Sequence, residues 1–175
     1  MIAFKKPVLE LNHTFDSHRK RHYLNGSMAV LHCHHFTTLY SQLALDAGQT
    51  DLLREVAEDS FYPILCGYFE EHGIGTLDER VAIATEYYAA VGMGVLRVTS
   101  MGDDAGEVAL QVSHVDQGWI KKWGTYDKPV NYITAGYIAA LFSACLDLPP
   151  RAFTVVETES IVTGAKESVF KVVRN

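Results

Sequence analysis

The spacing of apolar residues predicts helices in the first half of the chain. Residues 27–47 carry apolar side chains every three or four positions, on a face centred on Phe36, and Gly48 follows as a helix end. A second segment with this spacing begins at Asp51 and includes Pro63, which is expected to kink or divide that helix. We therefore expect two successive helical segments in this region.

A capping-box pattern at Thr76 and Glu79 predicts a third helix, after which the pattern changes to that of strands. Residues 94–101 and 107–115 are separated by the turn-rich segment GDDAG, which predicts a hairpin. His114 continues the apolar alternation of the second strand, so its side chain is expected to point inward or toward the rim of a pocket.

A long helix and two further strands close the chain. The helix is expected to begin near Asp127 and to end near Leu146, and FTVVETES and ESVFKVVR form two strands around Gly164. Hairpins separated by a long helix favour an antiparallel sheet. We therefore predict an α+β fold, in which N-terminal helices precede a ββαββ unit whose sheet packs against helices.

The start of the chain differs from the rest because it is mostly polar. It includes the basic cluster His18–His22, which is typical of a solvated face. No internal repeat or low-complexity linker divides the remainder. We expect residues 1–26 to form an arm and residues 27–175 to form one domain.

Composition excludes several classes of partner. The 175 residues are 48% hydrophobic and 21% charged, which indicates an ordinary globular protein. The formal net charge of −6 argues against nucleic acid or an anionic membrane as the main partner, because both favour a dense basic surface. No apolar run is long enough to span a bilayer, and three separated cysteines without a secretory signal suggest reduced thiols. We expect a soluble cytoplasmic protein with no nucleic-acid or membrane partner.

Histidine is frequent, with eight residues in the chain, and this suggests metal or ligand binding. If residues 27–47 are helical, His32 lies on the apolar face, His35 lies on its flank and His34 points away. His32 and His35 could hold a metal ion only with a third ligand from another element, such as His114 or Glu86. The alternative is that His32 is an imidazole in an apolar pocket, where it hydrogen-bonds a ligand or a neighbour. No other cofactor is predicted.

Two further features leave other chemistry open. Cys33 lies beside histidines, so an enzyme that uses Cys33 and a histidine is an alternative. Trp119 and Trp123 are four positions apart and, with Tyr126, either line a pocket or pack against the end of the sheet. The chain contains no nucleophile elbow, phosphate-binding loop or dinucleotide fingerprint.

The C-terminal half resembles a known family of small-molecule-binding domains. KPVNYITAGYIAALFSACLDLP, with its Gly136–Tyr137 pair, and FTVVETESIVTGAKESVFKVV are similar to the 4-vinyl reductase, or hydrocarbon-binding, domain family over residues 91–173. The wider superfamily includes sensory domains of aromatic-responsive transcription regulators, heme nitric-oxide sensors and transport-complex subunits. The resemblance implies an apolar or aromatic ligand, and it implies a homodimer because members of the family often pair.

The aromatic-responsive sensors of this family hold a structural zinc ion with three cysteines and a glutamate, and this chain departs from that pattern. The glutamate matches Glu157, but the cysteine positions fall on Ser160, on Ser168 and near Asn131. Serine hydroxyls are poor zinc ligands. We therefore expect no zinc, and we expect Glu157, Ser160 and Ser168 to hydrogen-bond one another across the hairpin.

We predict that the chain binds or senses a small apolar or aromatic molecule in a pocket between helices and sheet. The alternatives are an enzyme that uses Cys33 or a histidine-bound metal, and an interaction scaffold without a ligand. No catalytic residue is predicted. The expected ligand-binding residues combine the histidine-rich segment with the inward histidine and the two tryptophans: they are His32, His35, Phe36, Tyr40, His114, Trp119 and Trp123.

Overall fold

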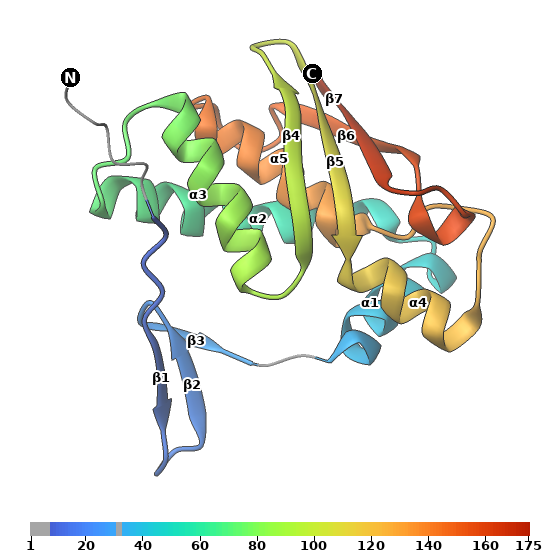
Figure 1. The fold of residues 1–175 in the computed structure, drawn as a ribbon, viewed down its shortest axis with the longest axis horizontal. Coiled ribbons are helices and arrows are strands. Elements are labelled where there is room, and N and C mark those ends of the chain that lie inside the picture. The colour runs from blue at the N-terminus through green and yellow to red at the C-terminus, as the bar shows by residue number, and fades with distance from the viewer. Residues whose placement is uncertain (1–7, 31–32) are drawn as a thin grey trace.

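Five helices and a four-stranded antiparallel sheet form the body of the protein within residues 8–30 and 33–175, which this computed structural model describes (Figure 1). The helices are α1 (His34–Asp46), α2 (Thr50–Glu71), α3 (Leu77–Ala90), α4 (His114–Trp123) and α5 (Tyr132–Cys145), with a short 3-10 helix η1 (Ile161–Thr163). The strands of the main sheet are β4 (Gly94–Met101), β5 (Ala105–Ser113), β6 (Phe153–Glu159) and β7 (Ser168–Arg174).

These elements confirm the predicted α+β fold. The hairpins β4–β5 and β6–β7 pair through β5 and β7, which gives the order β4–β5–β7–β6. The helix α5 contacts both the sheet and α2 (Figure 1). Large apolar side chains such as Leu110, Phe142 and Phe170 are fully buried in this core. In the described residues, no helix has both the length and the apolar character needed to cross a membrane.

The composition of α5 explains its central place. It contains no charged residue, and a helix that is apolar on all sides is stable when it is buried on all sides. Two of its polar side chains have partners in the core: the Tyr137 hydroxyl donates to the carbonyl of Ala84 at 2.6 Å, and the Thr134 hydroxyl bonds the Tyr88 hydroxyl at 2.8 Å. Burial raises the pKa of Tyr137 well above its usual value, so this phenol remains a neutral donor.

The structure tests two predictions about the N-terminal helices. The predicted capping box starts α3: the Thr76 hydroxyl accepts a bond from Glu79 N at 3.3 Å, and the Glu79 carboxylate accepts one from Thr76 N at 3.2 Å. The helix α2 is continuous through Pro63, so of the two outcomes predicted for this proline, a kink or a division, the division does not occur. Buried residues on both sides of Pro63, among them Ala57 and Leu65, pack α2 onto the core and offset the missing backbone bond.

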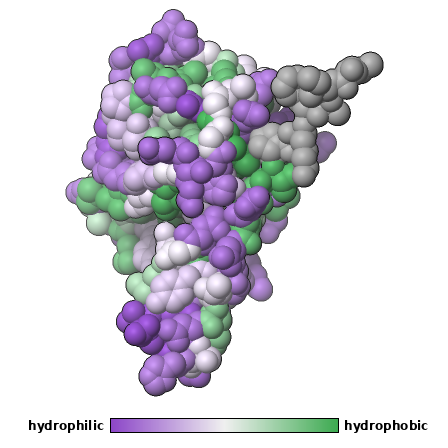
Figure 2. Space-filling model, turned by 90° about the vertical axis from the view of Figure 1, so that its left-hand side faces the viewer, coloured by the Kyte–Doolittle hydropathy of each residue, from purple (hydrophilic) through white to green (hydrophobic). Residues whose placement is uncertain are grey.

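The predicted arm is a small antiparallel sheet that projects from the body (Figure 1). Its strands are β1 (His13–Asp16), β2 (Arg21–Leu24) and β3 (Ser27–Ala29). Residues 27–29 were predicted to be helical, and that prediction is wrong. Asn25 and Gly26 have φ angles of 46° and 78°, which suit a tight hairpin turn, and this turn pairs residues 27–29 with β2. Figure 2 shows the tip of the arm as mostly hydrophilic.

The segment after β5 also differs from its prediction. The strand ends at Ser113, and His114 is the first residue of α4 rather than a strand residue. The Ser113 hydroxyl accepts a bond from Asp116 N at 3.0 Å and so caps the helix, a local signal that apolar alternation does not detect. Trp119 and Trp123, which are four positions apart in the sequence, both lie on this helix.

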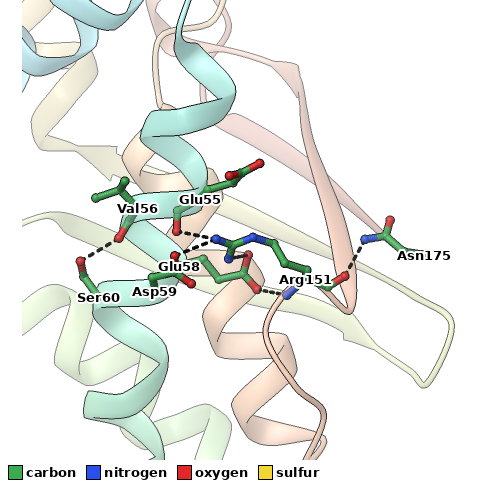
Figure 3. A network of polar contacts seen from close by, with 7 residues as sticks. All are labelled: Glu55, Val56, Glu58, Asp59, Ser60, Arg151 and Asn175. Carbon is green, nitrogen blue, oxygen red and sulfur yellow. Dashed lines mark hydrogen bonds and ion pairs between the residues drawn. The ribbon is translucent and has the colours of Figure 1, made fainter.

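An ion pair between the exposed Arg151 and the buried Glu58 fastens the segment that precedes β6 to α2 (Figure 3). Glu58 on α2 is 4% exposed, and its carboxylate accepts bonds from Arg151 N at 2.7 Å and from Arg151 Nη1 at 2.8 Å. The carbonyl of Arg151 in turn accepts a bond from Asn175 Nδ2 at 2.8 Å. Arg151 therefore joins α2 to both ends of the β6–β7 hairpin.

Replacing Arg151 by alanine is expected to lower the free energy of unfolding by about 2 kcal/mol, because the buried Glu58 carboxylate would lose its cationic partner. Urea unfolding measures this loss. The control is Asp59→Asn, since the exposed Asp59 pairs with the same guanidinium but its replacement leaves the Glu58 pair intact. Equal losses in the two variants would contradict the role given to Glu58.

Candidate functional site

An apolar cavity of about 620 Å³ lies among the helices, next to the loop that joins α3 to β4. Residues of α1, α2, α4 and α5 contribute to its wall. The described residues that line it are Val30, Thr37, Tyr40, Leu53, Val56, Ala57, Ser60, Phe61, Val91, Gly92, Met93, His114 and Ile133.

The cavity wall carries polar groups but no charged side chain among these described residues. Its polar side chains are three hydroxyls, those of Thr37, Tyr40 and Ser60, and the imidazole of His114. The Ser60 hydroxyl already donates to the carbonyl of Val56 at 2.7 Å. A pocket of this kind suits a ligand that is largely apolar and carries a group that can hydrogen-bond.

The position of His114 follows from the cap of α4. Its backbone N–H donates to the carbonyl of Met93 at 3.0 Å, which ties the first turn of α4 to the α3–β4 loop. The His34 ring packs edge-on against the His114 ring, and the two ring centroids are 6.1 Å apart. Partial burial lowers the pKa of His34, and the charges of His35, Lys121 and His114 lower it further. The neutral form of His34 is therefore favoured beside the cavity wall.

The predicted apolar face of α1 is not its buried face, and this prediction is wrong. Phe36 is 53% exposed, whereas Thr37, Thr38 and Ser41 are buried. The cause is a close contact with α4, where a Cβ atom built on Gly118 would lie 2.8 Å from the Thr38 methyl carbon. Only small side chains fit at that distance, so α1 turns its small polar residues inward and its large apolar residues outward.

The predicted ligand-binding residues are not all in one place. Tyr40 and His114 line the cavity, whereas His35 and Phe36 lie on the exposed part of α1 and do not. His32 lies outside the described residues, so its predicted place on an apolar face stays a prediction.

The two tryptophans lie on α4, away from the cavity. Trp119 is buried in a small separate core with Val115, Val130 and Val162. The Trp123 ring is exposed and stacks under the Lys122 ammonium at 4.2 Å. Neither tryptophan lines the cavity, and whether either contacts a ligand stays a prediction.

Sequence reasoning missed most of the cavity wall. Val56, Met93 and Ile133 come from three distant segments, and each follows an ordinary apolar pattern in its own element. No local signal marks them, because the cavity exists only where α1, α2 and α5 meet the α3–β4 loop.

The structure shows no grouping of three or more histidine, cysteine, aspartate or glutamate side chains arranged to hold a metal ion within the residues it describes. His34, His35 and His114 approach one another through ring contacts. The proposed pairing of His32 with His35 around a metal is not tested, since His32 lies outside the described residues.

The fold is similar to that of solved structures, as comparison with known proteins shows. No protein-family model matches the chain, and no curated protein matches it. The chain is similar to the crystal structure of the phenol-responsive sensory domain of the transcription activator PoxR with phenol, with a TM-score of 0.76 and 12% identity. That match covers 93% of this chain and 84% of the sensory domain.

Two further solved structures are similar. Subunit 3 of a trafficking protein particle complex from Naegleria fowleri, covalently bound to palmitic acid, matches with a TM-score of 0.54 and 11% identity, over 81% of this chain and 95% of that one. A vinyl-4-reductase family protein from Methanocaldococcus jannaschii matches with a TM-score of 0.48 and 14% identity, over 70% and 68%. The sensory domain and the trafficking subunit confirm, at the level of the fold, the resemblance predicted from residues 91–173.

Proposed function

We propose that the chain binds a small, neutral, largely apolar molecule in the cavity beside His114, and that this binding serves a sensing role. The observation that carries the proposal is the cavity wall, which is apolar with one imidazole and three hydroxyls. Two proteins of the same fold support it, since one was solved with phenol and another carries palmitic acid. An apolar cavity of about 620 Å³ favours ligand binding over the alternative of a scaffold without a ligand.

The wall favours a neutral ligand over an ion. A carboxylate or ammonium group would lose its hydration in the cavity and find no opposite charge among the described lining residues. The His114 imidazole can donate to or accept from a hydroxyl or carbonyl. We therefore assign His114 the polar contact, and the apolar residues of α2 the contact with the body of the ligand. Cys33 is exposed outside the cavity wall, and this proposal gives it no role.

Filling the cavity is expected to weaken ligand binding. The neutral dye N-phenyl-1-naphthylamine should fluoresce with the unmodified protein, and Val56→Trp should weaken its binding at least about tenfold by occupying the space. Val156→Trp is a matched control, because Val56 and Val156 are 51% and 53% exposed but only Val56 lines the cavity. Dye binding that survives Val56→Trp would contradict the proposal.

The role of His114 has a separate test, in which 1-naphthol and naphthalene displace the dye. These ligands differ only by one hydroxyl, so their affinity ratio measures the polar contact. His114→Leu is expected to lower that ratio by up to about tenfold, the value of one hydrogen bond, and to leave naphthalene binding nearly unchanged. An unchanged ratio would assign the polar contact to another residue while leaving the cavity proposal intact.

We also propose that the chain forms a homodimer through the arm. The arm, defined as β1 to β3, exposes Phe15 and Met28, and a sheet this small needs a further apolar surface to be stable. Its turn carries a basic run, residues 19–21, whereas the exposed side of α2 is rich in acidic residues. Leu43 and its apolar neighbours on α1 are also exposed. Charge and hydropathy therefore favour packing of each arm against the α1–α2 surface of a second copy.

Sedimentation is expected to show a dimer that single charges disrupt. Phe15→Glu on the arm and Leu43→Glu on α1 should each shift the protein to monomer, because each places a carboxylate in the apolar contact. Val156→Glu, at a similar exposure on β6, should not. A monomer at all concentrations in the unmodified protein would exclude the dimer, and it would leave the cavity proposal unaffected.

We propose a cytoplasmic location from the state of the thiols. Cys33, Cys66 and Cys145 are all free, and Cys33 is exposed, which suits a reducing compartment. Burial raises the pKa of Cys145 to about 12, so that thiol is protected. Fractionation of cells that express the chain tests this location.

A further inference from the structure

A single buried carboxylate, that of Asp116 on α4, joins three parts of the fold. Its Oδ1 atom accepts hydrogen bonds from Ser160 Oγ at 3.4 Å and from Val162 N at 3.2 Å. Its Oδ2 atom accepts bonds from Asn131 Nδ2 at 2.8 Å and from Ser168 Oγ at 3.3 Å. These donors belong to the β6–β7 connection, to the residue that precedes α5 and to the first residue of β7. One side chain therefore holds elements that are far apart in the sequence.

The network around Asp116 is buried and complete. The side chains of Ser113, Asn131, Ser160 and Ser168 are buried with it. Ser113 Oγ donates to Asn131 Oδ1 at 3.1 Å and accepts a bond from Asp116 N at 3.0 Å. Among the described residues, the buried side-chain atoms that lack a partner all lie elsewhere. None of the ion pairs in the described part of the chain involves Asp116, so its charge is balanced by hydrogen bonds.

These residues include the positions where the sequence resemblance implied zinc, and they do not fit a zinc ion. Zinc ligands direct lone pairs at the ion. Here the amide of Asn131 and the hydroxyls of Ser160 and Ser168 direct hydrogen atoms at the Asp116 carboxylate. Glu157, which matches the zinc glutamate, also accepts a bond from Asn131 Nδ2 at 2.8 Å, so these donors are shared by two carboxylates. Groups that converge as donors stabilise an anion and repel a cation. The expected hydrogen bonding among Glu157, Ser160 and Ser168 is present, and it also includes Asp116, an acceptor that sequence reasoning missed.

We propose that Asp116 is an anionic hub that holds α4, the start of α5 and the β6–β7 connection together without a metal ion. A charged acceptor forms stronger hydrogen bonds than a neutral one, so the negative charge is part of the function and not only the shape of the side chain. The hub also fixes the first turn of α4, which carries His114 into the cavity wall.

The experiment combines metal analysis with thermal unfolding of the full chain, produced without a histidine tag. Elemental mass spectrometry should find no stoichiometric zinc, and a strong chelator should leave the melting midpoint unchanged. Asp116→Asn keeps the shape and removes the charge, and it should lower the midpoint by roughly 10 °C. Asp103→Asn, in the exposed β4–β5 turn, is the control and should melt like the unmodified protein.

Two results would overturn the proposal. One is a zinc ion present in equal amount to the chain, with a chelator that lowers the melting midpoint. The other is an Asp116→Asn variant that melts together with Asp103→Asn. If Asp116→Asn does not fold, Ser160→Ala and Ser168→Ala each remove one donor, and each should lower the midpoint by a few degrees. Midpoints equal to that of the unmodified protein in both serine variants would also contradict the hub.

Discussion

Replacing Gly136 by alanine is expected to destabilise the protein by about 3 kcal/mol, although alanine is normally the better helix residue. A Cβ atom at this position would lie 2.2 Å from the carbonyl oxygen of Arg54 and 2.7 Å from the Ala57 Cβ. Both neighbours belong to α2, and one is backbone, so α2 and α5 would have to move apart. Because α5 is buried on all sides, that movement would loosen the whole core.

Gly67 provides the matched control for this substitution. It also lies in a helix, α2, but a Cβ atom built there meets nothing within 4 Å. Gly67→Ala is therefore expected to be neutral or to add up to about 1 kcal/mol through helix propensity. Urea unfolding of both variants measures the difference. If Gly136→Ala is as stable as Gly67→Ala, the backbones of α2 and α5 are not in close contact at Gly136, and this prediction is wrong.

The second large effect is a loss of stability as the pH rises from about 4.5 to 7. The pKa of Glu157 is raised from 4.5 to about 7, because burial and the charge of Asp116 together outweigh the hydrogen bonds with Ser160, Asn131 and Ser168, which lower it. The folded chain therefore keeps a proton that the unfolded chain releases in this range. Stability from this group is fully present below pH 4.5 and is lost as the pH passes 7, by up to about 3 kcal/mol.

The variant Glu157→Gln isolates this effect, because glutamine is neutral at every pH. The difference in unfolding free energy between the unmodified protein and Glu157→Gln should change across pH 4.5 to 7, in favour of the variant at the higher pH. Glu159→Gln, on the exposed part of the same strand, serves as control. The lowered pKa of His34 acts in the opposite direction below pH 6.5, but it is common to all variants and cancels in the difference. A flat difference would show that Glu157 is ionised throughout.

Much of the fold was predictable because its signals are local. The capping box of Thr76 and Glu79 depends on residues three positions apart, and it starts α3 where predicted. The apolar run of α5 and the turn at Gly164 depend on neighbouring residues in the same way. The Asn25–Gly26 turn is equally local, and it was an available signal for the arm that the helical interpretation of residues 27–47 overlooked.

The candidate site was much less predictable. The apolar positions of α1 predicted a buried face, but contact with α4 at Gly118 selects small side chains and turns that face outward. The cavity wall joins Thr37, Val56 and His114 from three helices, and its shape depends on the spaces left between them. The missing cysteines predicted the absence of zinc, but nothing in the sequence indicated that Asp116 would take the centre of the network.

The sequence by itself determined the α+β class, the central place of α5 and most elements of the body, though not α4 or the strands of the arm. Propensity, capping and apolar periodicity act over a few residues, and so they can be recognised in the sequence. Only the tertiary structure decided which face of α1 is buried, where the cavity lies and which carboxylate the polar residues surround. Those outcomes depend on distances of a few ångströms between segments far apart in the chain. A side chain such as Asp116 has no special neighbours in the sequence, and it becomes a hub only when β7 and α5 bring their donors to it.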